Sequence, residues 1–110
     1  MEERERRIGR NQALFREVNE RIERVSGALR TGTDELTILC ECGNETCAEH
    51  IEVSSSEYER IRGESTLFLL RPGHAKPEVE EVVEHHDGYD VARKNGPAAE
   101  VADELDPRDD

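Results

Sequence analysis

A chain of 110 residues is long enough for one domain with tails. Hydrophobic residues make up 34% of it and charged residues 38%, and Trp is absent, so the supply of core side chains is small. Small domains bury a low fraction of their surface and often need an additional staple. No apolar run approaches the roughly 18 residues of a membrane span, and Met1–Arg10 lacks the apolar stretch of a signal peptide.

The formal net charge of -12 is unevenly distributed. Residues 1–30 contain eight Arg and six Glu, a net charge of +2, whereas residues 31–110 contain seven Lys or Arg and 21 Asp or Glu, a net charge of -14. An acidic body is repelled by nucleic acid and by anionic membranes. We therefore expect neither of these partners. A protein partner with a basic surface fits the charge better.

Residues 1–30 predict one long helix, because no Pro interrupts them and a polar break at residues 30–35 contains Gly32. Its a and d heptad positions are mostly apolar and are flanked by Leu14 and Ala28. The heptad consists of Ile8, Asn11, Phe15, Val18, Ile22, Val25 and Leu29. Two interpretations are open: a short coiled coil through which the protein self-associates, or an amphipathic helix that packs this stripe on its own domain.

Apolar runs at residues 36–40, 50–53 and 66–70 predict three short strands, of which the last is the most apolar and reads as a central strand. A short helix is expected between the second and third strands. Ser54 and Glu57 have the spacing of a capping box, and Val53 and Tyr58 stand at the two ends of a hydrophobic staple. Gly63 is expected to end this helix.

Residues 77–94 fit two structures. Val79, Val82 and Val83 have helical spacing, but Asp87-Gly88 is a strong signal for a two-residue hairpin turn, and the hairpin is the favoured prediction. Residues 95–110 are rich in small and acidic residues, which predicts a flexible tail with at most a brief helix at residues 98–105.

The three cysteines of the chain, Cys40, Cys42 and Cys47, fall within eight residues. An odd number of cysteines argues against a disulfide framework and for the reducing cytoplasm. Structural zinc takes four N or S ligands, thiolates above all, and closing short loops between ligands costs little entropy. We expect the three thiols to bind one metal ion. Zinc suits the tight spacing better than an iron–sulfur cluster; the alternative is a buried Cys40 with two incidental thiols.

The fourth ligand is open between two histidines. His50 lies three residues after Cys47 but begins a strand, whereas His74 sits on a Pro-Gly turn after the most apolar strand. A ligand at His74 would tie two halves of the domain together. His85 and His86 are disfavoured, because adjacent residues on a strand face opposite ways.

Several stretches of the chain resemble a group of small uncharacterised bacterial proteins. The resemblance covers about residues 14–105 and is carried by Ile38–Gly43 with Cys47, Glu57–Arg62, Pro72–His74 and Pro77–Glu84. Members usually have the three Cys and the Pro-Gly-His, while the position of His50 is often not His. The resemblance therefore implies His74 as the fourth ligand, and it implies no activity. Tyr89–Lys94 is more polar than the Val-rich stretch common in the group.

These patterns predict an α+β fold: a long N-terminal helix followed by a small zinc-stapled antiparallel sheet with one short helix. The expected division is a coiled-coil-like helix at 1–30, a zinc-binding domain at 34–94 and an acidic flexible tail at 95–110. The predicted function is a non-enzymatic interaction or regulatory module, with a thiol-based redox sensor as the alternative. A zinc hydrolase is less favoured, because the sequence offers no distinctive general base.

Overall fold

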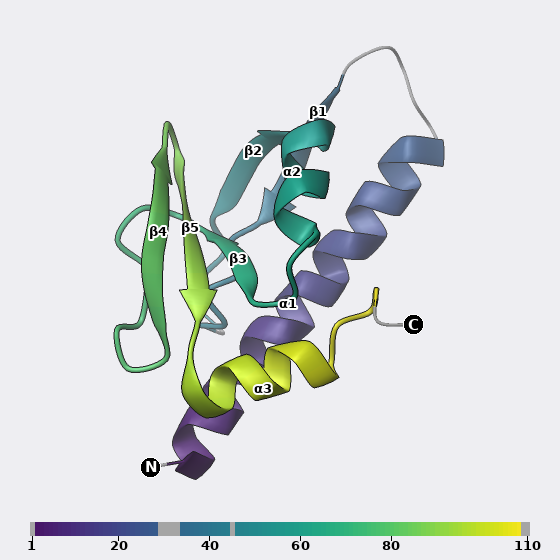
Figure 1. Cartoon of the computed structure of the whole chain (residues 1–110). Helices are drawn as coiled ribbons and strands as arrows, with labels where there is room; N and C mark the ends of the chain where they lie inside the picture. The colour runs from purple at the N-terminus through teal and green to yellow at the C-terminus, as the bar shows by residue number, and fades with distance from the viewer. Residues whose placement is uncertain (1, 29–33, 45, 109–110) are drawn as a thin grey trace.

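The computed structural model describes residues 2–28, 34–44 and 46–108 (Figure 1). Along these residues the elements are α1 (Glu2–Ala28), β1 (Glu35–Leu39), β2 (His50–Ser54), α2 (Ser55–Arg62), β3 (Leu67–Leu70), β4 (Glu80–His86), β5 (Tyr89–Lys94) and α3 (Gly96–Glu104). The predicted α+β class is confirmed, with a long N-terminal helix ahead of small antiparallel sheets. None of the helices in the described part of the chain is long and apolar enough to cross a membrane.

The strands in the described residues form two antiparallel sheets, β1-β2 and β3-β5-β4. The predicted hairpin at 77–94 is confirmed as β4 and β5, which are joined through Gly88 with φ +89°. The expectation that the apolar run at 66–70 is a central strand is wrong, because β5 takes that place. β3 is nevertheless fully buried, and the Glu41 amide donates to the Leu69 carbonyl of β3 over 2.9 Å. The segment after β1 therefore joins the two sheets.

The core lies between the inner faces of the two sheets and α2. β1 and β2 alternate, so that Leu36 and Ile38 pair with Val53 and Ile51 on the buried side. α2 adds Tyr58 and Ile61, both fully buried, while β3 and β5 add Leu69, Leu70, Val91 and Ala92. The predicted N-cap is confirmed, since Ser54 Oγ accepts a hydrogen bond from the Glu57 amide at 3.1 Å.

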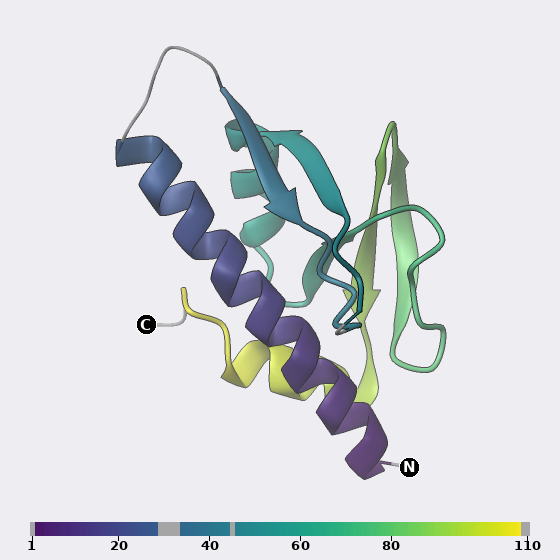
Figure 2. The ribbon, with the colours of Figure 1, turned by 180° about the vertical axis from the view of Figure 1, so that it is seen from behind.

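α1 packs on its own domain, but not with the face that the heptad pattern indicates. It contacts α3 and β1 and crosses the back of the molecule (Figure 2). Its buried residues are Gly9, Gln12, Ala13, Arg16, Asn19 and Glu20. Of the predicted stripe, Ile22 packs against the core cluster, but Val25 is 56% exposed, as is the flanking Leu14 at 59%. Leu29 lies outside the described residues, as do the side chain of Ala28 and residues 109–110 of the predicted tail.

The brief helix allowed at residues 98–105 of the predicted tail is present as α3, but this helix packs against α1 and is not part of a flexible tail. Ala98, Val101 and Ala102 are buried on one face of this helix. A close approach is possible because α1 presents Gly9, where a Cβ would lie only 3.2 Å from the Cα of Ala98. The guanidinium of Arg16 in α1 also donates to the Ala102 carbonyl over 2.7 Å.

Candidate metal centre

The structure brings together the four residues that the sequence predicts as metal ligands. Cys40 and Cys42 follow β1, Cys47 lies in the loop before β2, and His74 lies in the turn after β3. Their ligand atoms are all within 4.8 Å of one another. His74 Nδ1 is 3.4 Å from Cys40 Sγ and 3.7 Å from Cys47 Sγ. The arrangement is compatible with a bound metal ion.

The first two thiols are placed by the extended chain that leaves β1. Residue alternation turns Cys40 and Cys42 to one side and Glu41 to the other. The Cys40 amide continues the β1-β2 pairing by donating to the Glu49 carbonyl at 3.0 Å. Gly43 then turns the chain with φ +78°, a conformation that favours glycine.

Two tight turns bring in the other two ligands. The Cys47 amide donates to the Asn44 carbonyl at 2.9 Å, which returns the chain to the first two thiols. After β3, the His74 amide donates to the Arg71 carbonyl at 3.1 Å, and Gly73 has φ +85°. The backbone amide of Arg71 also donates to Cys40 Sγ at 3.2 Å, so this turn contacts the cluster twice.

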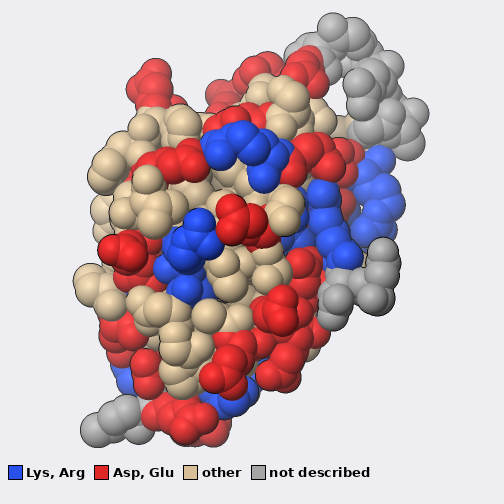
Figure 3. Space-filling view, viewed as in Figure 1, with Lys and Arg blue, Asp and Glu red and all other residues tan. Residues whose placement is uncertain are grey.

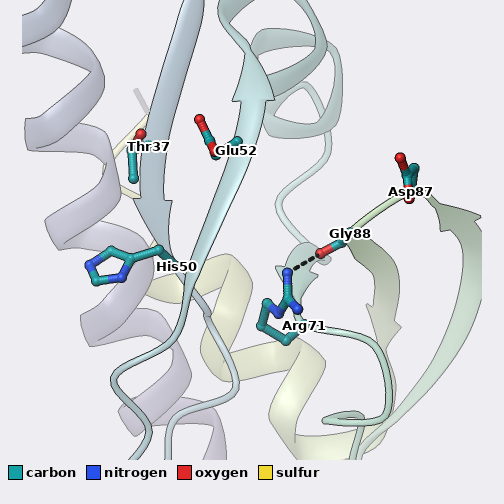
Figure 4. Close-up of a pocket in the computed structure, with 6 residues that line it drawn as sticks. All are labelled: Thr37, His50, Glu52, Arg71, Asp87 and Gly88. Carbon is teal, nitrogen blue, oxygen red and sulfur yellow. Dashed lines mark hydrogen bonds between the residues drawn. The ribbon is translucent and has the colours of Figure 1, made fainter.

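The alternative ligand His50 lies elsewhere. It is exposed at the start of β2, opposite Leu39, and it lines an open groove of about 480 Å³ between the β1-β2 sheet and the β4-β5 turn. The other lining residues are Thr37, Glu52, Arg71, Asp87 and Gly88, with the Arg71 guanidinium reaching the Gly88 carbonyl (Figure 4). His85 and His86 also lie outside the cluster, next to Asp90 and Glu84.

The donor set is compatible with a metal ion. Cys40 and Cys42 are 3% and 2% exposed, and burial raises the pKa of the Cys40 thiol to about 12, against the lowering effect of the Arg71 amide. Burial therefore favours the protonated thiol, whereas a bound divalent cation would favour the deprotonated thiolates. On a bound ion, three thiolates and one imidazole would complete a tetrahedral shell and would leave no position for a reactive water.

The opposite side of the same segment is held by α1. Asn19 makes two hydrogen bonds to the backbone of Leu39. Its Oδ1 accepts from the Leu39 amide and its Nδ2 donates to the Leu39 carbonyl, both at 2.8 Å. Asn19 Nδ2 also donates to the fully buried Glu41, whose pKa is raised chiefly by burial. Gln12 donates to the Cys42 carbonyl at 3.3 Å. Sequence reasoning missed these residues; their only signal is the spacing of Gln12, Arg16 and Asn19 along one helix face.

Comparison with known proteins adds no assignment to this geometry, since no family model, no curated protein and no solved structure matches the chain. The resemblance to small bacterial proteins therefore stays a prediction.

Proposed function

We propose that the protein is a non-enzymatic interaction or regulatory module whose fold is held by a zinc ion on Cys40, Cys42, Cys47 and His74. The observation that carries this proposal is the convergence of these four ligand atoms within 4.8 Å, from three separate segments of a core-poor chain. Zinc is the metal that such a thiolate and imidazole set suits best. A filled shell of four protein ligands favours a structural role over hydrolysis.

The metal content of the protein tests this proposal. We expect one zinc per chain after purification without added metal, measured by elemental analysis. His74→Ala should lose most of this zinc, whereas His50→Ala, in the groove nearby, should keep all of it. A wild-type chain with no stoichiometric metal would overturn the proposal, and loss of zinc in His50→Ala alone would reverse the ligand assignment.

Self-association through α1 is one form that the interaction takes in this proposal. The apolar stripe that the heptad pattern predicts is left partly uncovered, since Val25 and the flanking Leu14 are both more than half exposed. Because α1 also packs against α3 and β1, deleting it would disturb the domain, so a surface double variant is the better test. Sedimentation should show a concentration-dependent dimer for the wild type and a monomer for Leu14→Gln/Val25→Gln. A monomeric wild type at all concentrations would contradict self-association.

A basic protein is the other proposed partner. Carboxylates are spread over the face shown in Figure 3, with basic side chains between them, and residues 31–110 carry a net charge of -14. A lysine-rich peptide should therefore bind with an affinity that falls as salt rises. Replacing Glu52 and Asp87, which line the groove, by Gln and Asn should weaken that binding; equal binding by this variant would exclude the groove as the contact surface.

A redox sensor is the second candidate, and the uneven burial of the thiols supports it. Cys47 is half-buried while Cys40 and Cys42 are buried, so an oxidant has access from one side. Peroxide would convert two thiolates and two protons to a disulfide and two waters, releasing the metal. A zinc-sensitive dye should report release that a thiol reductant reverses in the presence of zinc. Thiols that stay reduced under mild peroxide would exclude this candidate.

A further inference from the structure

The two ring nitrogens of His74 face different surroundings. Nδ1 points at the thiols, 3.4 Å from Cys40 Sγ and 3.7 Å from Cys47 Sγ. Nε2 lies 3.2 Å from a carboxylate oxygen of Glu49, the residue just before β2. We propose that Glu49 is the positioning residue of the metal centre, which fixes His74 so that Nδ1 alone binds the metal.

The chemistry of imidazole supports this role. A nitrogen that binds a metal carries no proton, so a neutral histidine that ligates through Nδ1 carries its proton on Nε2. That N–H is the donor that the Glu49 carboxylate needs. With the proton on Nδ1, the lone pair of Nε2 would face the carboxylate, and with the ring flipped a ring carbon would face it. Carboxylate partners of this kind typically raise metal affinity by about 10–100-fold.

Glu49 is itself held by the turn that carries His74. Arg71 Nε donates to the second carboxylate oxygen of Glu49 at 3.2 Å, and Arg71 Nη1 donates to the Gly88 carbonyl at 2.9 Å. The Arg71 amide meanwhile donates to Cys40 Sγ. Arg71 thus contacts the proposed ligand Cys40 through its backbone amide and the carboxylate of Glu49 through its side chain.

In so acidic a chain, a histidine next to a carboxylate is expected and does not by itself indicate a metal centre. His85 lies 3.0 Å from Asp90 and His86 lies 2.7 Å from Glu84. The His74–Glu49 pair differs from both because the remaining ring nitrogen faces two thiols. Since the Glu49 side chain is 53% exposed, it can be replaced without opening the core.

This inference rests on the proposed zinc site, and its test separates the two. Glu49→Ala is compared with Glu52→Ala, which removes an exposed carboxylate of β2 that lines the groove and is not one of the four clustered residues. Zinc affinity is measured by chelator competition on the full chain. We expect a loss of about 10–100-fold for Glu49→Ala, a smaller loss for Glu49→Gln, whose amide oxygen can still accept from Nε2–H, and none for Glu52→Ala.

The nitrogen that binds the metal gives a second readout, which a merely structural role would not move. In ¹⁵N-labelled, zinc-loaded wild type, only Nδ1 of His74 should show the shift of a metal-bound nitrogen. In Glu49→Ala, a fraction of the molecules should also show His74 bound to zinc through Nε2. If Glu49→Ala binds zinc as tightly as the wild type and through Nδ1 alone, the role of Glu49 is overturned and the zinc site stands. If the wild type binds no zinc, both proposals fall.

Discussion

The segment Leu39–Gly43 has two sides that are held in different ways. On one side, Cys40 and Cys42 meet Cys47 and His74 in a cluster of metal-ligating type. On the other side, α1 covers the segment with neutral polar side chains that bind its backbone. A metal ion on the first side would contribute a few strong bonds, whereas the helix side contributes several hydrogen bonds of about 1 kcal/mol each.

The comparison shows how a chain with little apolar material places a long helix. α1 buries Gln12, Arg16 and Asn19 completely, and each of these side chains donates to a backbone carbonyl of the surface beneath the helix. Such groups are costly to bury unless each has a partner. A metal on the far side would fix the same backbone, so we expect docking of α1 to depend on metal binding.

The largest expected effect is that of removing the metal. Structural zinc in small domains contributes roughly 10 kcal/mol or more of apparent binding free energy, which is comparable to the whole stability of a domain. A strong chelator should therefore abolish the cooperative thermal transition seen by circular dichroism, and added zinc should restore it. An unchanged melting temperature in chelator would mean that the helix side holds the fold alone.

Gly43→Ala should produce the next largest effect, because Gly43 lies where the two sides meet. An added Cβ would lie 2.7 Å from Gln12 Cγ and 3.0 Å from the Gln12 backbone nitrogen, and φ is +78°. Strain and overpacking together should cost about 2–4 kcal/mol in the free energy of urea unfolding.

Gly73→Ala is the matched control for this variant. Its φ of +85° is equally strained, but nothing lies within 4 Å of the added Cβ. It should cost only about 1–2 kcal/mol, the conformational part of the effect. Equal losses at the two glycines would show that α1 does not press on the segment.

Asn19→Ala tests the helix side without touching the metal ligands. It removes the partners of the Leu39 amide and carbonyl and one partner of buried Glu41, and an unsatisfied buried group costs about 1–3 kcal/mol. We expect a loss of about 2–3 kcal/mol in urea unfolding, with one zinc per chain retained. Asn11→Ala, on the half-buried stripe, should cost well under about 1 kcal/mol. A similar loss in both variants would contradict a stabilising role for the two hydrogen bonds between Asn19 and the Leu39 backbone.

The same contrast explains which features of the fold and the site can be predicted from the sequence. The sequence identifies the four candidate ligands, Cys40, Cys42, Cys47 and His74, because few roles other than metal binding place such residues so close together. It also predicts the hairpin, because Asp87-Gly88 is a typical two-residue turn. The packing face of α1 is not recognisable in this way. Apolar periodicity assumes that apolar residues are the buried ones, whereas here the buried face pairs with backbone groups that only the folded chain brings together.

The packing of α3 on the domain was missed for a related reason. Its buried residues are small, so its composition resembles that of a mobile acidic tail. Its stability depends on the contact with Gly9 of α1, nearly ninety positions away in the chain, and no local pattern carries that information.

The smallest effect is expected at a second cluster, Glu57, Glu84 and His86, whose ligand atoms meet the same distance limit as the thiol site. Arg60 already binds both carboxylates, at 2.7 Å each, so this cluster should hold no metal. Glu84→Gln should leave one zinc per chain. It should lower stability at pH 7 by no more than about 0.5 kcal/mol, as expected for a surface ion pair.

The pH dependence of that small loss has a definite sign. Hydrogen bonds from Arg60 and then His86 lower the pKa of Glu84 from 4.5 to about 2. The pair therefore stabilises the fold fully above pH 4.5 and loses its contribution as the pH falls towards 2. Urea unfolding of wild type and Glu84→Gln at pH 7 and pH 4 should show a smaller difference at pH 4. A larger difference there, or zinc lost with Glu84, would make this cluster a metal site and remove the contrast with the thiols.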